Sequence, residues 1–258
     1  MKRLIGKYNF YKRNGYCILN LFNSNDIKKI KILLSKQLNN ISKKRFFNEN
    51  ILQDYHKVVY KKESLHKKFV DPNSRFIKLS KNLNKKILNK ELLFILKKEW
   101  GHKDCATSWI GQYNKRQVKL NAIGFRIARP NIQRNKKDVA GVHIDLNSGG
   151  TIGVDFSTLI TIWIPVIGSS SKYSLRISPR SHTIDHSKSF ARGKKISYVC
   201  NKNYEKKFNF IRPNLNIGQA ILFHSNLIHG NSFNIGKLSR MSLDCRILNL
   251  KKFNRANN

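Results

Sequence analysis

Two histidines and one aspartate form a possible ligand set for a metal ion. His143 and Asp145 are separated by one residue, and His229 follows far downstream. Two neutral imidazoles and one carboxylate are the protein ligands of non-heme ferrous iron, which keeps open positions for other ligands. We therefore interpret His143, Asp145 and His229 as candidate iron ligands.

Arg240 and Ser242 follow the second histidine and alternate with apolar residues. Side chains two positions apart on a strand leave the same face of a sheet. A guanidinium and a hydroxyl on one face could together hold a carboxylate. This pair would suit a dicarboxylate co-substrate of an iron site.

The local sequence must place these side chains on defined elements. Residues 140–145 read as a strand, which puts His143 and Asp145 on one face. His229 ends an apolar run and precedes Gly230, where the missing side chain permits close backbone approach. Both segments are therefore expected to bring their ligands to one point.

Strand-like runs of β-branched and aromatic residues dominate the chain after Gly101. Eight short strands with few helices between them predict a mainly β (α+β) fold, a double-stranded β-helix (jelly-roll or cupin-like) barrel. The predicted strands are 120–128, 140–145, 158–166, 174–178, 196–200, 208–211, 219–224 and 240–249.

The first part of the chain is predicted to be helical, apart from a short strand over 15–19. Apolar residues at helical spacing from Ile27 to Ile41 predict a helix that Ser24 or Asn25 caps, with Asp26 at its positive end. A second amphipathic helix is expected to end at Gly101. We predict a single domain over 1–258, in which a helical part (1–105) packs on a jelly-roll core (106–250).

The stretch from about 120 to 247 resembles the phytanoyl-CoA dioxygenase-like family of Fe(II)- and 2-oxoglutarate-dependent oxygenases. The resemblance lies in the order and spacing of Phe125-Arg126-Ile127-Ala128-Arg129-Pro130, His143-x-Asp145, Thr161-Ile162-Trp163-Ile164-Pro165, Ile177-Ser178-Pro179-Arg180-Ser181-His182, His229-Gly230 and Arg240-x-Ser242. Arg180 replaces the family's glycine, so the resemblance leaves the geometry of that turn open.

The resemblance implies a role for each matching residue. His143, Asp145 and His229 would bind Fe(II), and Arg240 would bind the distal carboxylate of 2-oxoglutarate. Trp163, Asn231 and Ser242 would lie beside that co-substrate. The implied activity is a dioxygenase that uses O2, hydroxylates a small molecule and releases succinate and CO2. Asp145 disfavours halogenation, because the halogenating relatives lack this carboxylate.

Several other polar residues have competing interpretations. His182, Asp185 and His186 have the spacing of a helical metal site, but no further ligand accompanies them. His224 is interpreted as a core or supporting residue. Arg126 and Arg129 could contact substrate or be solvated, and Asp244 and Arg246 are expected to pair with each other.

The chain of 258 residues carries 51 Lys and Arg against 14 Asp and Glu, a net charge of +37. Basic pairs are spread along the sequence, whereas a nucleic-acid site usually concentrates its charge. Biased composition is therefore the favoured explanation, and an anionic small-molecule substrate is a second one. The alternative function is a non-enzymatic basic jelly-roll protein that binds nucleic acid or another polyanion.

The four cysteines form no CxxC pair, and the longest apolar stretch is too short to span a bilayer. The N-terminus lacks the apolar region of a secretory signal. These features predict reduced thiols and a cytoplasmic location, and they leave the oligomeric state open.

Overall fold

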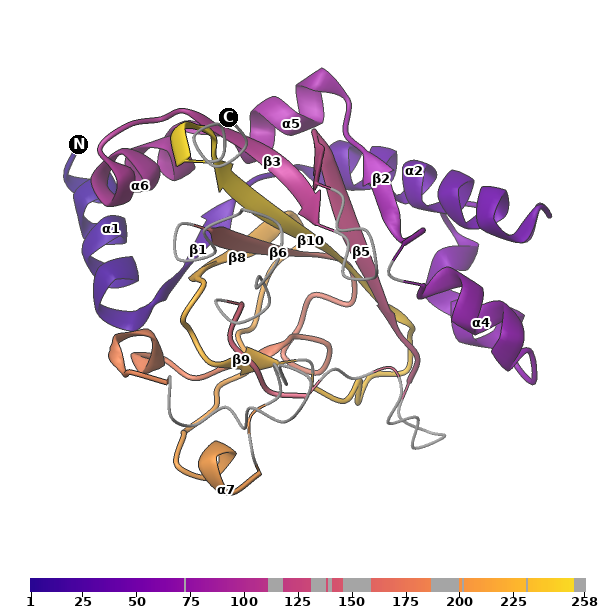
Figure 1. Ribbon diagram of the computed structural model, residues 1–258. Helices are drawn as coiled ribbons and strands as arrows, with labels where there is room; N and C mark the ends of the chain where they lie inside the picture. The colour runs from indigo at the N-terminus through magenta and orange to yellow at the C-terminus, as the bar shows by residue number, and fades with distance from the viewer. Residues whose placement is uncertain are drawn as a thin grey trace.

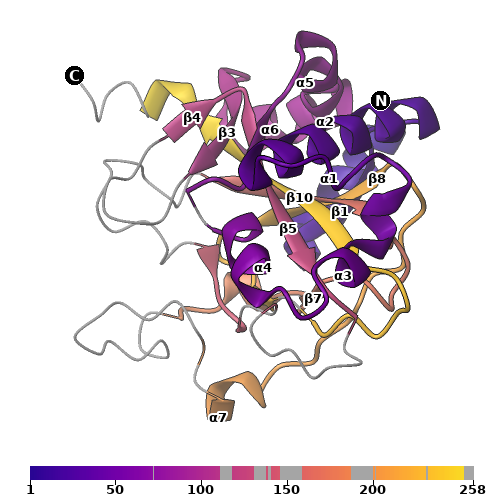
Figure 2. The ribbon, with the colours of Figure 1, turned by 90° about the vertical axis from the view of Figure 1, so that its right-hand side faces the viewer.

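The computed structural model describes residues 1–71, 73–110, 118–130, 138, 141–145, 159–186, 200, 202–230 and 232–252. A large antiparallel sheet has helices on one side and a small two-stranded sheet on the other (Figure 1). Figure 2 shows the same arrangement from the side, with α3 and α4 beside the edge of the large sheet.

Within the described residues, the large sheet contains eight strands in the order β1-β8-β6-β10-β3-β4, with β5 pairing to β10 and β2 pairing to β5. Every pairing is antiparallel. The strands are β1 (Tyr16–Asn20), β2 (Phe76–Lys78), β3 (Cys105–Ile110), β4 (Val118–Leu120), β5 (Ala122–Ala128), β6 (Ile160–Ile167), β8 (Gln219–His224) and β10 (Arg240–Asn249). The small sheet pairs β7 (Arg176–Ile177) with β9 (His229–Gly230).

The helices lie mainly in the first hundred residues. They are α1 (Lys2–Asn14), α2 (Ser24–Ser42), α3 (Tyr55–Val58), α4 (Glu63–Phe69), α5 (Lys81–Ile87), α6 (Lys90–Trp100) and α7 (Lys202–Glu205), with short 3-10 turns at Ile51–Asp54 and Ser181–Thr183. Asn23 caps α2 through a reciprocal capping box with Asp26, so the predicted caps Ser24 and Asn25 were wrong by one and two positions. Gly101 ends α6 in the left-handed conformation, as expected.

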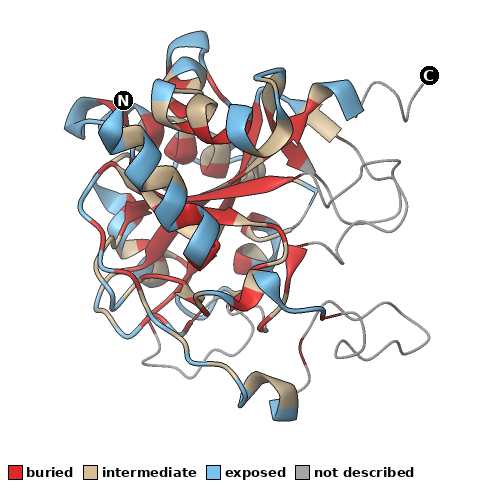
Figure 3. Cartoon of the chain, turned by 90° about the vertical axis from the view of Figure 1, so that its left-hand side faces the viewer, coloured by how far each residue is buried: buried red, intermediate tan, exposed pale blue. Residues whose placement is uncertain are grey.

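The two faces of the large sheet pack against different layers. Ile162, Leu222 and Leu243 belong to the apolar core shared with the helices. A second apolar cluster lies on the inner face, toward the small sheet. It includes Trp163 and Ile221, whose side chains leave the sheet on the face opposite to Ile162 and Leu222. β6 is buried along its whole length because both of its faces are covered. Figure 3 shows buried strands inside the molecule and exposed outer faces on the surrounding helices.

Several predicted elements differ from the structure. Residues 141–145 form an isolated bridge at His143 and no continuous strand, and 208–211 contribute only a bridge at Ile211. Most of 196–200 lies outside the described residues. Helix α1 and strands β2 and β3 were not predicted, because their sequences show neither clear amphipathic nor alternating patterns. Among the described residues, no helix is long and apolar enough to cross a membrane.

Candidate metal centre

The two histidines of the predicted ligand set are paired through their backbones. The amide of His143 donates to the carbonyl of His229 at 2.8 Å, and the reverse bond is 3.0 Å. This bridge extends the small sheet by one residue and places the two rings with their centroids 4.4 Å apart. At Gly230, a Cβ would lie 3.1 Å from the carbonyl oxygen of Gly141, so the glycine permits the close approach predicted for it.

The remaining ring nitrogens converge on Asp145. The Nε2 atoms of His143 and His229 lie 3.9 and 3.8 Å from its Oδ1 atom. The candidate ligand atoms of the three residues lie within 4.8 Å of one another, so that one ion could be shared among them. The structure thus brings together all three predicted metal ligands.

Backbone carbonyls orient both rings. Nδ1 of His143 donates to the carbonyl of Gly141 at 2.8 Å, and Nδ1 of His229 donates to that of Leu227 at 2.9 Å. A carbonyl can only accept, so these contacts place the proton on Nδ1 and leave the Nε2 lone pair free for a metal. Burial lowers the pKa of His143 to about 4, and the charge on His229 contributes, which keeps the ring neutral at neutral pH.

Asp145 is 1% exposed and is held by the large sheet. Arg246 on β10 donates to Oδ1 at 2.9 Å, and Thr161 on β6 donates to Oδ2 at 2.6 Å. Burial alone would raise the pKa of this carboxyl, but Arg246 and the two imidazoles lower it to about 2. The carboxylate is therefore ionised and oriented by neighbouring groups.

A chain of alternating charges continues from Asp145 across the inner face of the large sheet. Arg246 also donates to Asp244 at 3.0 Å, and Arg126 on β5 donates to the other oxygen of Asp244 at 3.2 Å. The predicted pairing of Asp244 with Arg246 is therefore present. Arg126 is not simply solvated, because it lies at the end of this chain.

Arg240 is fully buried, and within the described residues only one of its side-chain nitrogens has hydrogen-bond partners. Nη1 donates to the carbonyls of Tyr173 and Ser232 at 3.2 and 3.3 Å. Nε and Nη2 have no hydrogen-bond partner among the described residues. These two nitrogens form one edge of the guanidinium, the edge that a carboxylate can bind with both oxygens. Burial, together with Arg212 and Arg126, lowers the pKa of Arg240 to about 10.

Two further predicted residues have unsatisfied buried groups near Arg240 in the sheet. Within the described part of the chain, the Ser242 hydroxyl and the Trp163 indole nitrogen lack partners. Ser242 lies opposite Pro165, two residues from Trp163 on the neighbouring strand. A buried polar group without a partner is energetically costly. Several such groups close together are therefore typical of a site that binds a polar ligand. Asn231, the last predicted contact, lies outside the described residues.

The competing histidine cluster has other partners. His182 contacts the carbonyl of Lys12, and His186 contacts the Tyr204 hydroxyl and the carbonyl of Ser181. Among the described residues, only His143, Asp145 and His229 group as metal ligands. His224 accepts a hydrogen bond from the amide of Asn226.

Two features of the site were not predicted. Thr161 was not recognised as a partner of Asp145, although its position two residues before Trp163 indicates the same face of β6. Arg246 was expected to pair only with Asp244, and it also holds Asp145. Arg180 occupies the left-handed region at φ 68°, so the turn keeps a backbone conformation that favours glycine.

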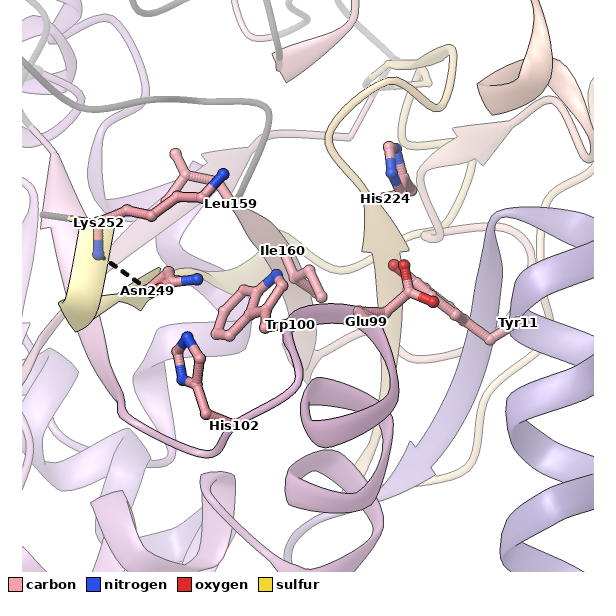
Figure 4. Close-up of a pocket in the computed structure, with 9 residues that line it drawn as sticks. All are labelled: Tyr11, Glu99, Trp100, His102, Leu159, Ile160, His224, Asn249 and Lys252. Carbon is pink, nitrogen blue, oxygen red and sulfur yellow. Dashed lines mark hydrogen bonds between the residues drawn. The ribbon is translucent and has the colours of Figure 1, made fainter.

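A cavity that is not lined by the three candidate ligands lies beside α1, α6 and the end of β10 (Figure 4). It encloses about 310 Å³, and Glu99, Tyr11 and His224 are among its lining residues. Glu99 accepts hydrogen bonds from the Tyr8 hydroxyl at 3.0 Å and from Lys12 at 3.4 Å. These contacts join α6 to α1. The polar side chains that line this cavity therefore belong to the interface between the two helices.

Comparison with solved structures identifies the fold. The chain is similar to the α-ketoglutarate-dependent carbocyclase SnoK of nogalamycin biosynthesis (TM-score 0.56, 11% identity, 95% of this chain and 83% of that chain). It is also similar to EctD from S. alaskensis with bound Fe (0.58, 13%, 96% and 77%) and to the epimerase SnoN (0.56, 12%, 96% and 84%).

No family model matches the sequence. No curated protein matches it either. At these identities the structural likeness establishes the architecture, and it confirms the predicted double-stranded β-helix with packing helices.

Proposed function

We propose that this protein is an Fe(II)- and 2-oxoglutarate-dependent dioxygenase that hydroxylates a small molecule. The observation that carries the proposal is the combination, inside one barrel, of the His143, Asp145 and His229 ligand set with the unpartnered carboxylate-binding edge of Arg240. Proteins of similar structure are named as α-ketoglutarate-dependent or contain Fe, which agrees with this combination.

One group of residues would bind the metal, and a second group would bind the co-substrate. His143, Asp145 and His229 would hold Fe(II), and Arg240 would neutralise the far carboxylate of 2-oxoglutarate with Ser242 and Trp163 beside it. When bound, the iron supplies activation of O2, and the net reaction converts substrate C–H, 2-oxoglutarate and O2 into substrate C–OH, succinate and CO2. Asn231 remains a proposed contact of the co-substrate.

The chain itself orients the three candidate ligands. Arg246 and Thr161 fix the Asp145 carboxylate, while the Gly141 and Leu227 carbonyls fix the two imidazoles. Phe223 packs against the His229 ring with centroids 4.5 Å apart. These contacts restrict the rotamers of the three candidate ligands.

The proposal is tested by anaerobic addition of Fe(II) and 2-oxoglutarate, with the visible charge-transfer band as the readout. The wild type is expected to show the band, and Asp145→Ala is expected to lose it with the metal. Arg240→Gln should bind Fe(II) normally but require a much higher 2-oxoglutarate concentration, because the carboxylate loses a charge-assisted partner. A wild type that binds Fe(II) but shows no band would contradict the proposal.

Hydroxylation is the finer part of the proposal and needs its own measurement. Similar structures include a carbocyclase and an epimerase, so the fold serves several oxidative outcomes. A metabolite screen for substrate-dependent succinate formation, followed by mass analysis of the product, should show the gain of one oxygen atom. A product without added oxygen would assign a different outcome to the same site.

A further inference from the structure

The charge chain of the inner face leads away from Asp145 to an additional cation, Arg75, at the start of β2. Arg126 and Arg246 are both paired, to Asp244 and Asp145. Burial is the main cause that lowers the pKa of the Arg75 guanidinium to about 9; Arg126 and Arg246 lower it further, whereas Asp244 and Asp71 raise it. Arg75 therefore adds a cation beside the paired Arg126, Asp244 and Arg246.

Arg75 has no ion-pair partner in the part of the chain that the structure describes, although its side chain is only partly exposed. Of the fourteen acidic residues in the sequence, only Asp155 lies outside the described residues. Asp71 lies within electrostatic reach of Arg75, but among the described residues it forms no ion pair with this guanidinium. An unpaired, partly buried guanidinium is costly unless a ligand satisfies it.

Aromatic side chains accompany this cation. Phe76, the residue after Arg75, contacts Trp109 with ring centroids 4.9 Å apart. The Lys119 ammonium lies 5.0 Å from the Phe76 ring centroid. A Cβ at Gly124 would come within 2.9 Å of the Trp109 ring, so the glycine makes room for the indole two residues from Arg126. Positive and aromatic groups therefore share one edge of the large sheet.

We propose that Arg75, with Arg126 and the Phe76–Trp109 pair, binds the anionic group of the substrate, a carboxylate or a phosphate ester on an apolar body. The inference rests on the proposed function, because the charge chain links this edge to the metal ligand Asp145. The guanidinium provides paired donors for oxygen atoms of either anion, and the rings cover the adjoining apolar part.

The test uses isothermal titration of the anaerobic protein with Fe(II) and 2-oxoglutarate, at one fixed salt concentration. The probes are benzoate, phenyl phosphate and the neutral benzamide. At least one anion should bind the wild type more tightly than benzamide. Arg75→Gln should weaken the binding of that anion about tenfold or more, because one charge-assisted contact is lost. Arg75→Lys should retain part of the affinity.

Lys78→Gln is the matched control, because Lys78 is exposed on the same strand and the net charge changes equally. Equal weakening in Lys78→Gln and Arg75→Gln would overturn the proposal, because it would indicate only the overall charge of the protein. Anions that bind no better than benzamide would also overturn it. Which anion binds more tightly distinguishes a carboxylate from a phosphate substrate.

The charge-transfer band separates this inference from the proposed function. Arg75→Gln should keep the band and the 2-oxoglutarate requirement of the wild type, since Arg240 is unchanged. If the band were absent from every protein, the proposed function would fail, and the same titration without iron and 2-oxoglutarate would still measure the contribution of Arg75 to anion binding.

Discussion

Asp145 shows how neighbouring residues prepare a ligand before any metal is bound. One oxygen receives Arg246 and the other receives Thr161, so both rotation and protonation of the carboxyl are restricted. The same Oδ1 atom that contacts Arg246 is the one nearest to both imidazoles. Arg246 is therefore a positioning residue for the candidate metal ligand.

Replacing Arg246 with lysine is expected to weaken metal binding. The shorter, single-point donor cannot contact Asp145, Thr161 and Asp244 together, so Asp145 loses its fixed orientation. We expect the dissociation constant for Mn(II) to rise about 10- to 100-fold, as for other residues that orient metal ligands. Isothermal titration measures the constant, with circular dichroism as the check on folding.

Arg176→Lys serves as the control, because Arg176 forms its ion pair with Glu205 and has no contact with Asp145. Its metal affinity should equal that of the wild type. Equal affinities in the wild type and Arg246→Lys would show that Arg246 does not position the ligand.

The convergence of the three candidate ligands could be predicted from the sequence, because alternation places His143 and Asp145 on one face. His143, Asp145 and His229 meet as expected, and Arg240 and Ser242 share one face of β10. Thr161 was missed because a threonine in an apolar strand carries no signal of its own. Its role depends on β6 lying beside β10, where Thr161 is opposite Arg246. Local sequence does not specify that pairing.

At the scale of elements, a buried polar network fixes α3 and α4 to the end of β5. The Asp138 carboxylate accepts hydrogen bonds from the Arg129 side chain and contacts His66. Arg129 also reaches Glu63, and His66 contacts the Tyr55 hydroxyl. Arg129 was expected to contact substrate or solvent, and it is instead a buried structural cation.

Asp138→Ala is expected to destabilise the protein by about 3 kcal/mol, because it removes a buried ion-pair partner of the buried Arg129. Chemical denaturation measures this loss. The control is Asp54→Ala, which removes an exposed pair with Lys57 and should leave the midpoint unchanged. A wild-type midpoint in Asp138→Ala would contradict the structural role of the network.

The same network predicts a pH dependence. Burial alone would raise the pKa of Asp138, but contacts with His66 and Arg129 lower it well below the ordinary 3.8. A lowered carboxyl pKa contributes stability above pH 3.8, and this stability is lost as the pH falls toward the folded-state value. Between pH 4 and the acid limit of folding, stability should fall less steeply in Asp138→Ala than in the wild type.

Strands with a clear sequence pattern were predicted correctly, and strands without one were missed. β8 and β10 have the predicted bounds. β8 is a short apolar run that ends in a turn, and in β10 polar and apolar residues alternate. β3 was missed because Cys105–Ile110 contains small polar residues that become buried only between β10 and β4. The bridge at His143 was predicted as a longer strand, since a sequence shows extended residues but not their pairing partners.

At the scale of the whole molecule, the positive charge is not concentrated on one element. Exposed lysines include Lys28 and Lys29 on α2, Lys97 and Lys98 on α6, and Lys206 and Lys207 after α7. Many acidic residues already form ion pairs, as Glu91 does with Lys7 and Asp26 with Lys86. The exposed surplus is thus distributed over distant helices, which favours the compositional explanation of the charge over a defined nucleic-acid site.

This distribution predicts how the protein should bind a polyanion. Duplex DNA should bind at low salt, with an affinity that falls steeply as salt rises, because counterion release drives the association. Lys28→Gln/Lys29→Gln and Lys206→Gln/Lys207→Gln should weaken binding by similar factors, since each double variant removes two charges from a diffuse field. Fluorescence anisotropy at several salt concentrations measures both effects. A much larger loss from one pair, with binding retained at physiological salt, would instead locate a defined interface and favour the polyanion-binding alternative.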